Sequence, residues 1–492
     1  MTPDDTLCLD PTASGAPAPE NPGAVPLTVD LDGTLLRTDT LHEALLALVA
    51  ERPSDIRHLP AWVAEGRAGL KARLADGGTL PGERLPLNAE VVALIEAARA
   101  EGRPTALVSA ADQRQVDAVA EATGLFDEAW GSTPGRNLKG EVKARFLVER
   151  FGAGGFDYIG DSHADLPVWK AARQGITVGA GARLRRTTSA LGTDMRHLDP
   201  SDAAAGLRAR LRAMRPHQWS KNLLLFLPAL AAHSFDAVLA VIPAFLAFCL
   251  AASSVYVIND LVDLDADRAH PRKRHRPFAS GELTPASGVV LAGGLLAASA
   301  ILALLVGPGF AGVLVVYLAV TFLYSVWLKR KLLVDVLTLA GLYTIRIVAG
   351  GVATATLLSA WMLGFSIFLF LCLAAVKRQA ELVDLAASGR VSSGRAYFPE
   401  DLPVIRGIAI SAAQATVLVF ALYIASDEVQ SLYNRPEILW AICPLLLYWS
   451  LRMVMKAHRG LMPDDPIVFA ASDRVSLVLI IACASLALAA AL

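Results

Sequence analysis

The sequence predicts a chain of two unlike halves, a soluble α/β domain followed by an all-helical domain that crosses a membrane about nine times. Hydrophobic residues make up 54% of the 492 residues and charged residues only 18%, whereas soluble domains carry about a quarter charged residues. Long apolar stretches recur only from about residue 222 onward. These two observations exclude a disordered chain and disfavour an ordinary soluble enzyme.

The charge balance and the cysteines narrow the class further. Lys and Arg number 45 against 46 Asp and Glu, a net charge of −1, so nothing indicates nucleic acid as a partner. The five cysteines are widely spaced and form no CxxC pair. A disulfide framework or a structural zinc site is therefore not expected, and a cytoplasmic redox environment is favoured.

Composition divides the chain into four segments. Residues 1–26 are rich in Pro, Ala and Asp and lack the basic start and apolar core of a signal peptide, so we expect a disordered tail. Residues 27–180 form the soluble domain, and residues 181–214 form a linker that ends in a basic stretch. Residues 215–492 form the membrane domain.

In the soluble domain, short apolar runs alternate with helical patterns, which predicts a parallel, Rossmann-like sheet with connecting helices. The segment between the first and second runs, residues 37–90, is mostly helical in pattern and predicts a small cap. The expected strands are Pro26–Val29, Ala106–Val108, Tyr158–Ile159 and Gly175–Val178.

The ends of these strands carry groups suited to phosphoryl chemistry. Asp30 and Asp32 lie two residues apart just past the first strand, so one carboxylate can attack phosphorus while the other protonates the leaving oxygen. Ser109 follows the second strand and could hold a phosphate oxygen. Lys143 opens a helical pattern and could offset the negative charge, although Lys139 is a rival for this role.

The third strand is followed by Asp161 and Asp165, whose carboxylates suit a hard cation such as Mg²⁺. The order of these strand-end residues along the chain resembles that of the haloacid-dehalogenase-like hydrolase superfamily over about residues 27–180. The resemblance implies that Asp30 is the nucleophile, that Asp32 is the acid/base, and that Ser109 and Lys143 bind phosphate. The implied metal residues are Asp30, Asp32, Asp161 and Asp165.

The membrane half contains stretches that approach the ~20 residues needed to cross a hydrocarbon core. The first is short and contains Pro228. Lys and Arg fill alternate loops, which places the N-terminal domain and the active sites on the cytoplasmic side of the inner membrane. The expected spans lie near residues 222–236, 237–258, 285–306, 309–328, 333–353, 358–376, 405–425, 436–455 and 470–490.

An aspartate-rich segment follows the second span. On a helix Asp260, Asp263 and Asp267 share one face, and Asn259 precedes them. Clustered carboxylates at a membrane boundary repel one another unless a cation joins them, and Mg²⁺ that bridges to a diphosphate is the natural use. Cations that follow could bind phosphate oxygens. These are Lys273, Arg274 and Arg276, whereas we expect Arg272 and His275 only to set topology.

The segment resembles the NDxxDxxxD motif of the UbiA-type intramembrane prenyltransferase superfamily. Residues 215–222, 324–329, 345–353 and 377–382 extend the resemblance to the decaprenyl-phosphate phosphoribosyltransferase branch. It implies phosphoribosyl diphosphate and a polyprenyl phosphate as substrates and Mg²⁺ as cofactor, with Asp260 and Asp263 catalytic and Asp267 a further metal residue. The expected substrate-binding residues are Lys221, Asn259, Lys273, Arg274, Arg276, Tyr324, Lys329, Arg346, Lys377 and Arg378, although Arg346 could equally be a structural anchor between helices.

One departure from the superfamily pattern favours the phosphoribosyl branch. Other members carry a second aspartate-rich motif between spans six and seven, but here that loop opens with Lys377 and Arg378, and only Glu381 and Asp384 are nearby acids. Phosphoribosyl diphosphate carries a phosphate at C5 besides the diphosphate at C1, which fits a mixed acidic and basic site. We therefore expect transfer of 5-phosphoribose to polyprenyl phosphate, followed by removal of the 5-phosphate by the N-terminal domain.

Two alternatives remain open at this point. The membrane domain could move a prenyl chain from its diphosphate to an aromatic or other acceptor, with an independent phosphatase domain. The chain could also be a membrane-anchored scaffold with two degenerate sites, which the intact aspartates disfavour. A homo-oligomer is compatible with the sequence.

Overall fold

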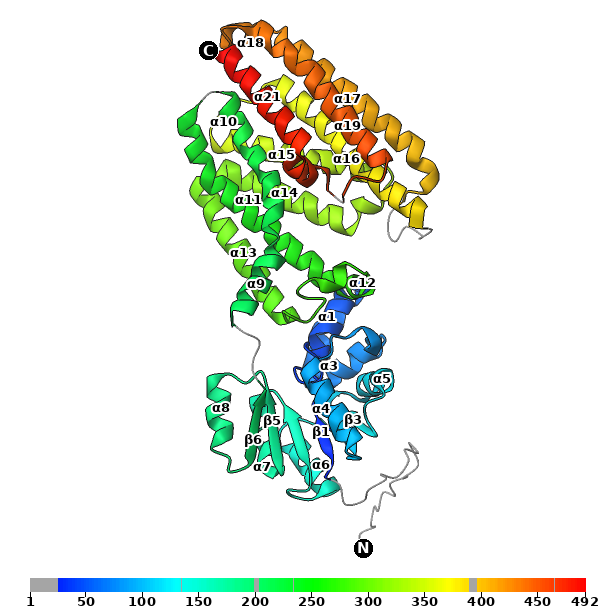
Figure 1. Cartoon of the computed structure of the whole chain (residues 1–492). Helices are drawn as coiled ribbons and strands as arrows, with labels where there is room; N and C mark the ends of the chain where they lie inside the picture. Colours follow the sequence, from blue (N-terminus) through cyan, green and yellow to red (C-terminus); the bar gives the residue numbers. More distant parts are fainter. Residues whose placement is uncertain (1–24, 134, 199–202, 233, 389–395, 464) are drawn as a thin grey trace. The chain divides into compact units, whose positions relative to one another are not determined.

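The computed structural model describes residues 25–133, 135–198, 203–232, 234–388, 396–463 and 465–492 (Figure 1). Nearly all of the expected disordered tail lies outside the described residues. The chain forms two compact units, one of residues up to 213 together with 258–290, and one of residues 214–257 and 291–492. Each unit has its own hydrophobic core.

The first unit is built on a parallel six-stranded sheet with the order β3-β2-β1-β4-β5-β6. All four expected strands are confirmed, and two more are found. The strand order reverses direction at β1, a switch point at which α/β sheets bind ligands beyond the carboxyl ends of their strands. The strands are β1 (Leu27–Val29), β2 (Thr105–Asp112), β3 (Glu128–Ser132), β4 (Asp157–Gly160), β5 (Gln174–Val178) and β6 (Asp194–Leu198).

The two additional strands, β3 and β6, form the edges of the sheet. Their sequences, EAWGS and DMRHL, mix polar and apolar residues, and both strands are only partly buried. An edge strand does not need the continuous apolar run of a strand buried on both faces. This is why apolar runs alone did not indicate them.

Helices cover the sheet and bury two separate apolar clusters. One cluster packs the strand residues Leu107 and Ile159 against Val91 of α4 (Ala89–Ala100) and Val116 of α5 (Gln113–Thr123). The other lies under α6 (Glu141–Phe151), α7 (Leu166–Ala171) and α8 (Ala182–Ser189). The sheet is therefore the middle layer of three, as in doubly wound folds.

The segment between β1 and β2 forms the expected helical cap. Asp39 caps the first helix, because its carboxylate accepts hydrogen bonds from the backbone N–H of Leu41 at 2.9 Å and of His42 at 3.2 Å. The cap consists of α1 (Thr40–Glu51), the 3₁₀ helix η1 (Pro53–His58), α2 (Leu59–Ala64), α3 (Gly66–Ala75) and the 3₁₀ helix η2 (Gly82–Arg84).

The remainder of the chain is helical. Among the described residues, eight helices are long and apolar enough to cross a membrane. Side chains such as Val290 and Leu305, both 76% exposed, cover their outer surfaces with hydrocarbon, which suits contact with lipid. The helices are α11 (Phe235–Val262), α13 (Pro285–Val306), α14 (Pro308–Val326), α15 (Val334–Ala353), α16 (Ala360–Ser388), α17 (Leu402–Ile424), α19 (Ile442–His458) and α21 (Arg474–Ala491).

The first of the nine expected spans differs from the others. In place of one long helix near residues 222–236, the chain forms the 3₁₀ helix η4 (Pro216–Phe226) and the short helix α10 (Leu227–Ala231). Pro228 lies at the start of α10. Because proline cannot donate to the preceding turn, it favours a new helix start over a continuous span.

Candidate active sites

The sheet brings the first group of expected residues to one edge. Asp30 follows β1, Asp161 follows β4, and Ser109 lies in β2, so three neighbouring parallel strands present them at their carboxyl ends. We expected the second strand to end at Val108, but β2 continues to Asp112, with a register shift between these two residues. The buried Ser109 hydroxyl accepts a hydrogen bond from the backbone of Ala111 at 3.0 Å.

Lys143 connects the carboxylates of this edge. It projects from the first turn of α6, is buried, and holds its Nζ 3.0 Å from Asp30 Oδ1 and 3.6 Å from Asp165 Oδ1. Lys143 also donates to the Tyr158 hydroxyl at 2.9 Å, which donates to Asp165 at 2.7 Å. Of the two lysines that the sequence left open, Lys143 lies against Asp30, and no described carboxylate pairs with Lys139.

Three carboxylates converge closely enough to share a cation. One oxygen each of Asp30, Asp161 and Asp165 lies within 4.8 Å of the others. Burial, followed by the charges of Asp30 and Asp165, raises the pKa of Asp161 to about 8. A site that holds several buried carboxylates against their own repulsion fits Mg²⁺, a hard cation that binds oxygen ligands. These three residues would hold the ion.

The Asp32 side chain is directed to a different partner. Its carboxylate accepts a hydrogen bond from the backbone N–H of Thr40, at the start of the cap, at 2.8 Å. Burial and the charge of Asp39 raise the pKa of Asp32 to about 7. Asp32 does not belong to the cluster of carboxylates formed by Asp30, Asp161 and Asp165. A carboxyl that titrates near neutrality can hold and release a proton, which suits the acid/base role.

Gly33 explains how the chain can turn so tightly between Asp32 and the cap. Its φ of +73° lies in the left-handed region that favours glycine. A Cβ at this position would collide with the carboxylate of Asp161. The close approach of the β1 loop to the β4 loop therefore depends on the absence of a side chain here.

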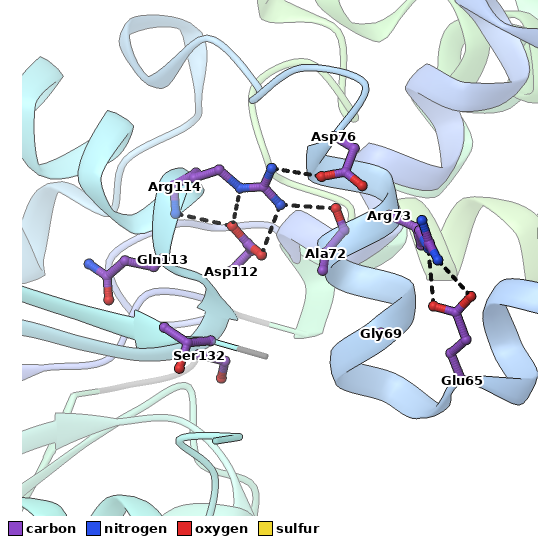
Figure 2. Close-up of a pocket in the computed structure, with 10 residues that line it drawn as sticks. Glu65, Gly69, Ala72, Arg73, Asp76, Asp112, Gln113, Arg114 and Ser132 are labelled. Carbon is purple, nitrogen blue, oxygen red and sulfur yellow. Dashed lines mark hydrogen bonds and ion pairs between the residues drawn. The ribbon is translucent and has the colours of Figure 1, made fainter. Parts of the chain in front are cut away.

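A cavity of about 510 Å³ lies between α3 of the cap and the ends of β2 and β3 (Figure 2). Arg114 crosses it and is held by Asp112 at 2.9 Å and by Asp76 at 2.8 Å. Arg73 pairs with Glu65 at 3.1 Å. These pairs compensate both guanidinium charges, so the cavity offers space beside the catalytic edge with little uncompensated positive charge.

The aspartate-rich segment of the membrane half is less regular than expected. The helix α11 ends at Val262 and α12 (Leu264–Ala269) begins after Asp263, although the backbone N–H of Asp267 still bonds to the carbonyl of Asp263 at 2.8 Å. Asp260 and Asp267 are buried and share Arg276, which lies 3.1 Å from Asp260 and 2.5 Å from Asp267.

Asp263 itself is exposed. Asp260, Asp263 and Asp267 do not form a group of metal-site dimensions among the described residues. Burial raises the pKa of Asp267, and Arg276 opposes that rise. The guanidinium thus compensates two carboxylates that we expected a metal to bridge, and the metal roles of all three remain predictions.

The other basic residues near the aspartates differ in their exposure. Lys273 and Arg274 are exposed, as are Arg272 and His275. Asn259, near the end of α11, is partly buried. Arg268 is different, because it donates two hydrogen bonds, at 2.6 and 2.7 Å, to the buried carboxylate of Glu43 in α1. Sequence patterns did not indicate this pair, since the two residues are 225 positions apart.

A positively charged cluster lies inside the second unit. Lys221 of η4 is buried and forms an ion pair with Asp465, the residue that caps α20 (Pro466–Ser472). Burial would raise the pKa of Asp465, but the charges of Lys221 and Lys377 outweigh it, so the pKa is lowered. Lys377 has no ion-pair partner in the described part of the chain. Sequence analysis missed Asp465, because nothing local distinguishes it from a helix cap.

Arg346 of α15 is fully engaged. Its Nε donates to Asn222 at 2.9 Å, and its Nη2 donates to the Tyr317 hydroxyl at 3.1 Å. Gly350 allows this arrangement, since a Cβ there would collide with the backbone carbonyl of Leu225 in η4. These contacts are those of an anchor between helices, and a role in phosphate binding stays a prediction.

Arg378 is buried and pairs with Asp335 and Glu381, while the Tyr397 hydroxyl donates to Asp335. The two adjacent cations of this loop therefore differ, because Arg378 is compensated and Lys377 is not. Of the remaining expected residues, Tyr324 is partly buried on α14, and Lys329 lies on the 3₁₀ helix Leu328–Arg330. Their binding roles also stay predictions.

Comparison with known proteins assigns both halves. The model of the UbiA prenyltransferase family matches residues 223–470. The chain belongs to this family. The haloacid dehalogenase-like hydrolase model matches residues 27–170, so the N-terminal domain is of that type. Together with the apolar helices, this makes the chain a multi-pass membrane protein with a UbiA-type transferase domain and a phosphatase-type domain.

Individual relatives match either most of the chain or a part of it. The chain is 40% identical over 460 residues to y4nM, an uncharacterized protein of Sinorhizobium fredii, covering 92% of this chain and 88% of y4nM. It is 37% identical over 276 residues to the nodulation protein NoeC of Azorhizobium caulinodans, and this match covers 55% of this chain and 89% of NoeC. It is 42% identical over 190 residues to decaprenyl-phosphate phosphoribosyltransferase of Mycolicibacterium smegmatis, and this match covers 37% of this chain and 59% of that enzyme.

Proposed function

We propose that this UbiA-family protein transfers 5-phosphoribose from phosphoribosyl diphosphate to a polyprenyl phosphate, and that its N-terminal domain then removes the 5-phosphate. The observation that carries the proposal is the cationic cluster of Lys221 and Lys377, in the region where other members place a second group of aspartates. The 42% identity to a decaprenyl-phosphate phosphoribosyltransferase supports the same donor. Mg²⁺ is the proposed cofactor of both domains.

In the transfer step, an oxygen of the lipid phosphate attacks C1 of the ribose. The bond from C1 to the diphosphate oxygen breaks, and diphosphate leaves with the electron pair. The attacking phosphate is already anionic, so no residue needs to remove a proton. Asp260, Asp263 and Asp267 would hold Mg²⁺, which when bound offsets the charge of the leaving diphosphate.

The cations of the second unit would hold the remaining phosphate. Lys377 has no competing carboxylate within ion-pair distance among the described residues, so its ammonium is available to an incoming anion. Lys221 forms an ion pair with Asp465, and its ammonium would contact a phosphate oxygen in place of part of this pair. Ammonium groups bind phosphate as point charges and tolerate different orientations of the sugar. A prenyl diphosphate offers no additional phosphate for them.

In the hydrolytic step, the carboxylate of Asp30 attacks the phosphorus of the 5-phosphate. The bond from phosphorus to the ribose oxygen breaks, and Asp32 donates the proton that this oxygen takes up. Water then releases phosphate from Asp30 and gives a proton back to Asp32. Burial raises the pKa of Asp30, and Lys143, with its Nζ 3.0 Å from Asp30 Oδ1, opposes this rise and favours the ionised nucleophile. Mg²⁺ held by Asp30, Asp161 and Asp165 would offset the charge of the phosphoryl group.

The choice of donor tests the transferase proposal. Purified full-length protein would be incubated with polyprenyl phosphate and labelled phosphoribosyl diphosphate, and separately with labelled prenyl diphosphate and an aromatic acceptor. We expect label in the lipid fraction only with the sugar donor, and its loss in Asp260→Asn. Asp265→Asn is the matched control, because Asp265 is exposed and pairs with Arg84 of the cap. Transfer of the prenyl label instead would establish the alternative function.

A further inference from the structure

Lys71 is a cation of the cap that points into the phosphatase site. It lies in α3, and its Nζ donates a hydrogen bond of 2.5 Å to the backbone carbonyl of Ala110. Ala110 directly follows Ser109, the expected phosphate binder in β2. The side chain thus extends from the cap to the strand end that presents Ser109.

The charges that act on Lys71 show which part of the site it occupies. Burial lowers the pKa of Lys71, and the carboxylates that oppose this most strongly are Asp32 and Asp39, followed more weakly by Asp30. Asp32 is the proposed proton donor to the leaving oxygen. Lys71 and Thr40 line the same small hollow, and the backbone N–H of Thr40 donates to Asp32 at 2.8 Å. This places Lys71 on the leaving-group side of the site.

Lys71 and Lys143 have different surroundings. Lys143 is neutralised at short range, 3.0 Å from Asp30 and 3.6 Å from Asp165. No described carboxylate lies within ion-pair distance of Lys71, and one backbone carbonyl is its only hydrogen-bond partner among the described residues. An ammonium has three donors, so two remain to be satisfied. A partly buried cation without a paired anion is costly to maintain.

A structural explanation accounts for only part of this arrangement. The hydrogen bond to Ala110 ties the cap to the strand end, but a neutral donor could make the same bond without the cost of burying a charge. The positive charge is needed only if an anion arrives. Since the 5-phosphate itself would lie between Asp30, Ser109 and Lys143, the anion that meets Lys71 is a different group.

On this basis we propose that Lys71 binds a second anionic group of the substrate, on the leaving-group side of the phosphomonoester. The proposal rests on the phosphatase activity proposed above and narrows its substrate class to sugar phosphates that carry another phosphoryl group. A ribose 5-phosphate joined to a lipid through a phosphodiester belongs to this class. Asp112 borders both the hollow that Lys71 lines and the 510 Å³ cavity. The larger cavity leaves room for the bulky remainder of the substrate (Figure 2).

The test compares two soluble probes that differ only in the second phosphate, ribose 1,5-bisphosphate and ribose 5-phosphate. Release of the 5-phosphate would be measured with the full chain in detergent, for the wild type, Lys71→Met, Lys71→Arg and Arg67→Met. Arg67→Met is the matched control, since Arg67 is an exposed cation of the same helix and borders neither the hollow beside Lys71 nor the 510 Å³ cavity. Asp30→Asn sets the background.

We expect wild-type kcat/KM to favour the bisphosphate by about tenfold, the effect of one charge-assisted hydrogen bond. Lys71→Met should reduce this ratio to near one, Lys71→Arg should restore most of it, and Arg67→Met should keep it. Equal losses with both probes in Lys71→Met would show that Lys71 only ties the cap, and an absent wild-type preference would also refute the inference. If the wild type hydrolyses neither probe above the Asp30→Asn background, the phosphatase proposal fails and this inference falls with it.

Discussion

The carboxylate group of the N-terminal domain predicts a pH-dependent affinity for Mg²⁺. The pKa of Asp161 is raised from 3.8 to about 8 by burial and by the charges of Asp30 and Asp165. In the metal-free protein this carboxyl is therefore protonated below about pH 8, and Mg²⁺ must displace the proton to bind. About half of this carboxyl is ionised at the pKa and about 1% two pH units below it, so the apparent affinity should fall about fiftyfold between about pH 8 and about pH 6.

The assay is the Mg²⁺ concentration that gives half-maximal hydrolysis of p-nitrophenyl phosphate, measured at several pH values and normalised to the maximum at each pH. This readout reports the phosphatase site and not the transferase site. The concentration should rise steadily as the pH falls below about 8 and level off above it. A half-maximal concentration that does not change over this interval would refute the assignment of Asp161 to a crowded metal site.

Three further predictions test single contacts. Lys143→Met should lower phosphatase kcat by about a hundredfold or more, because Asp30 loses its only short-range cation among the described residues, and phosphoribosyl transfer in the same preparation serves as the internal control. Gly33→Ala should lower the melting temperature of the N-terminal domain and abolish phosphate release, since the new methyl group meets Asp161; normal hydrolysis would show that the loop is free to move. Lys377→Met should raise the KM for phosphoribosyl diphosphate about tenfold, whereas Lys331→Met should not, because Lys331 is exposed. Equal effects of the two substitutions would contradict the assignment.

Much of the fold followed from apolar patterning. Four strands and the long helices are stretches in which burial or lipid contact requires continuous hydrocarbon, so the sequence indicates them directly. The edge strands β3 and β6 were missed because half-buried strands tolerate polar residues. The expectation that residues 222–236 form one helix was wrong, because a new helix starts with Pro228 in its first turn. The apolar run alone does not show this break.

The candidate sites were predictable where secondary structure alone brings residues together. Asp30 and Asp161 meet because parallel strands end at the same edge of a sheet. Lys71, Asp465 and Glu43 were missed, since each acquires its partner through tertiary packing across a long stretch of sequence. Arg276 likewise pairs with both Asp260 and Asp267 only because the loop after α12 folds back onto them. The spacing of the aspartates in the sequence does not reveal this.

The central claim is that one chain first makes a phosphorylated lipid sugar and then dephosphorylates it. Mass spectrometry of the lipid product formed from phosphoribosyl diphosphate and polyprenyl phosphate tests this most directly, with wild type compared with Asp30→Asn. We predict that the wild type accumulates lipid-linked ribose and inorganic phosphate, and that Asp30→Asn accumulates the 5-phosphorylated lipid at the same rate of transfer. The same phosphorylated product from both proteins would contradict the coupling of the two domains.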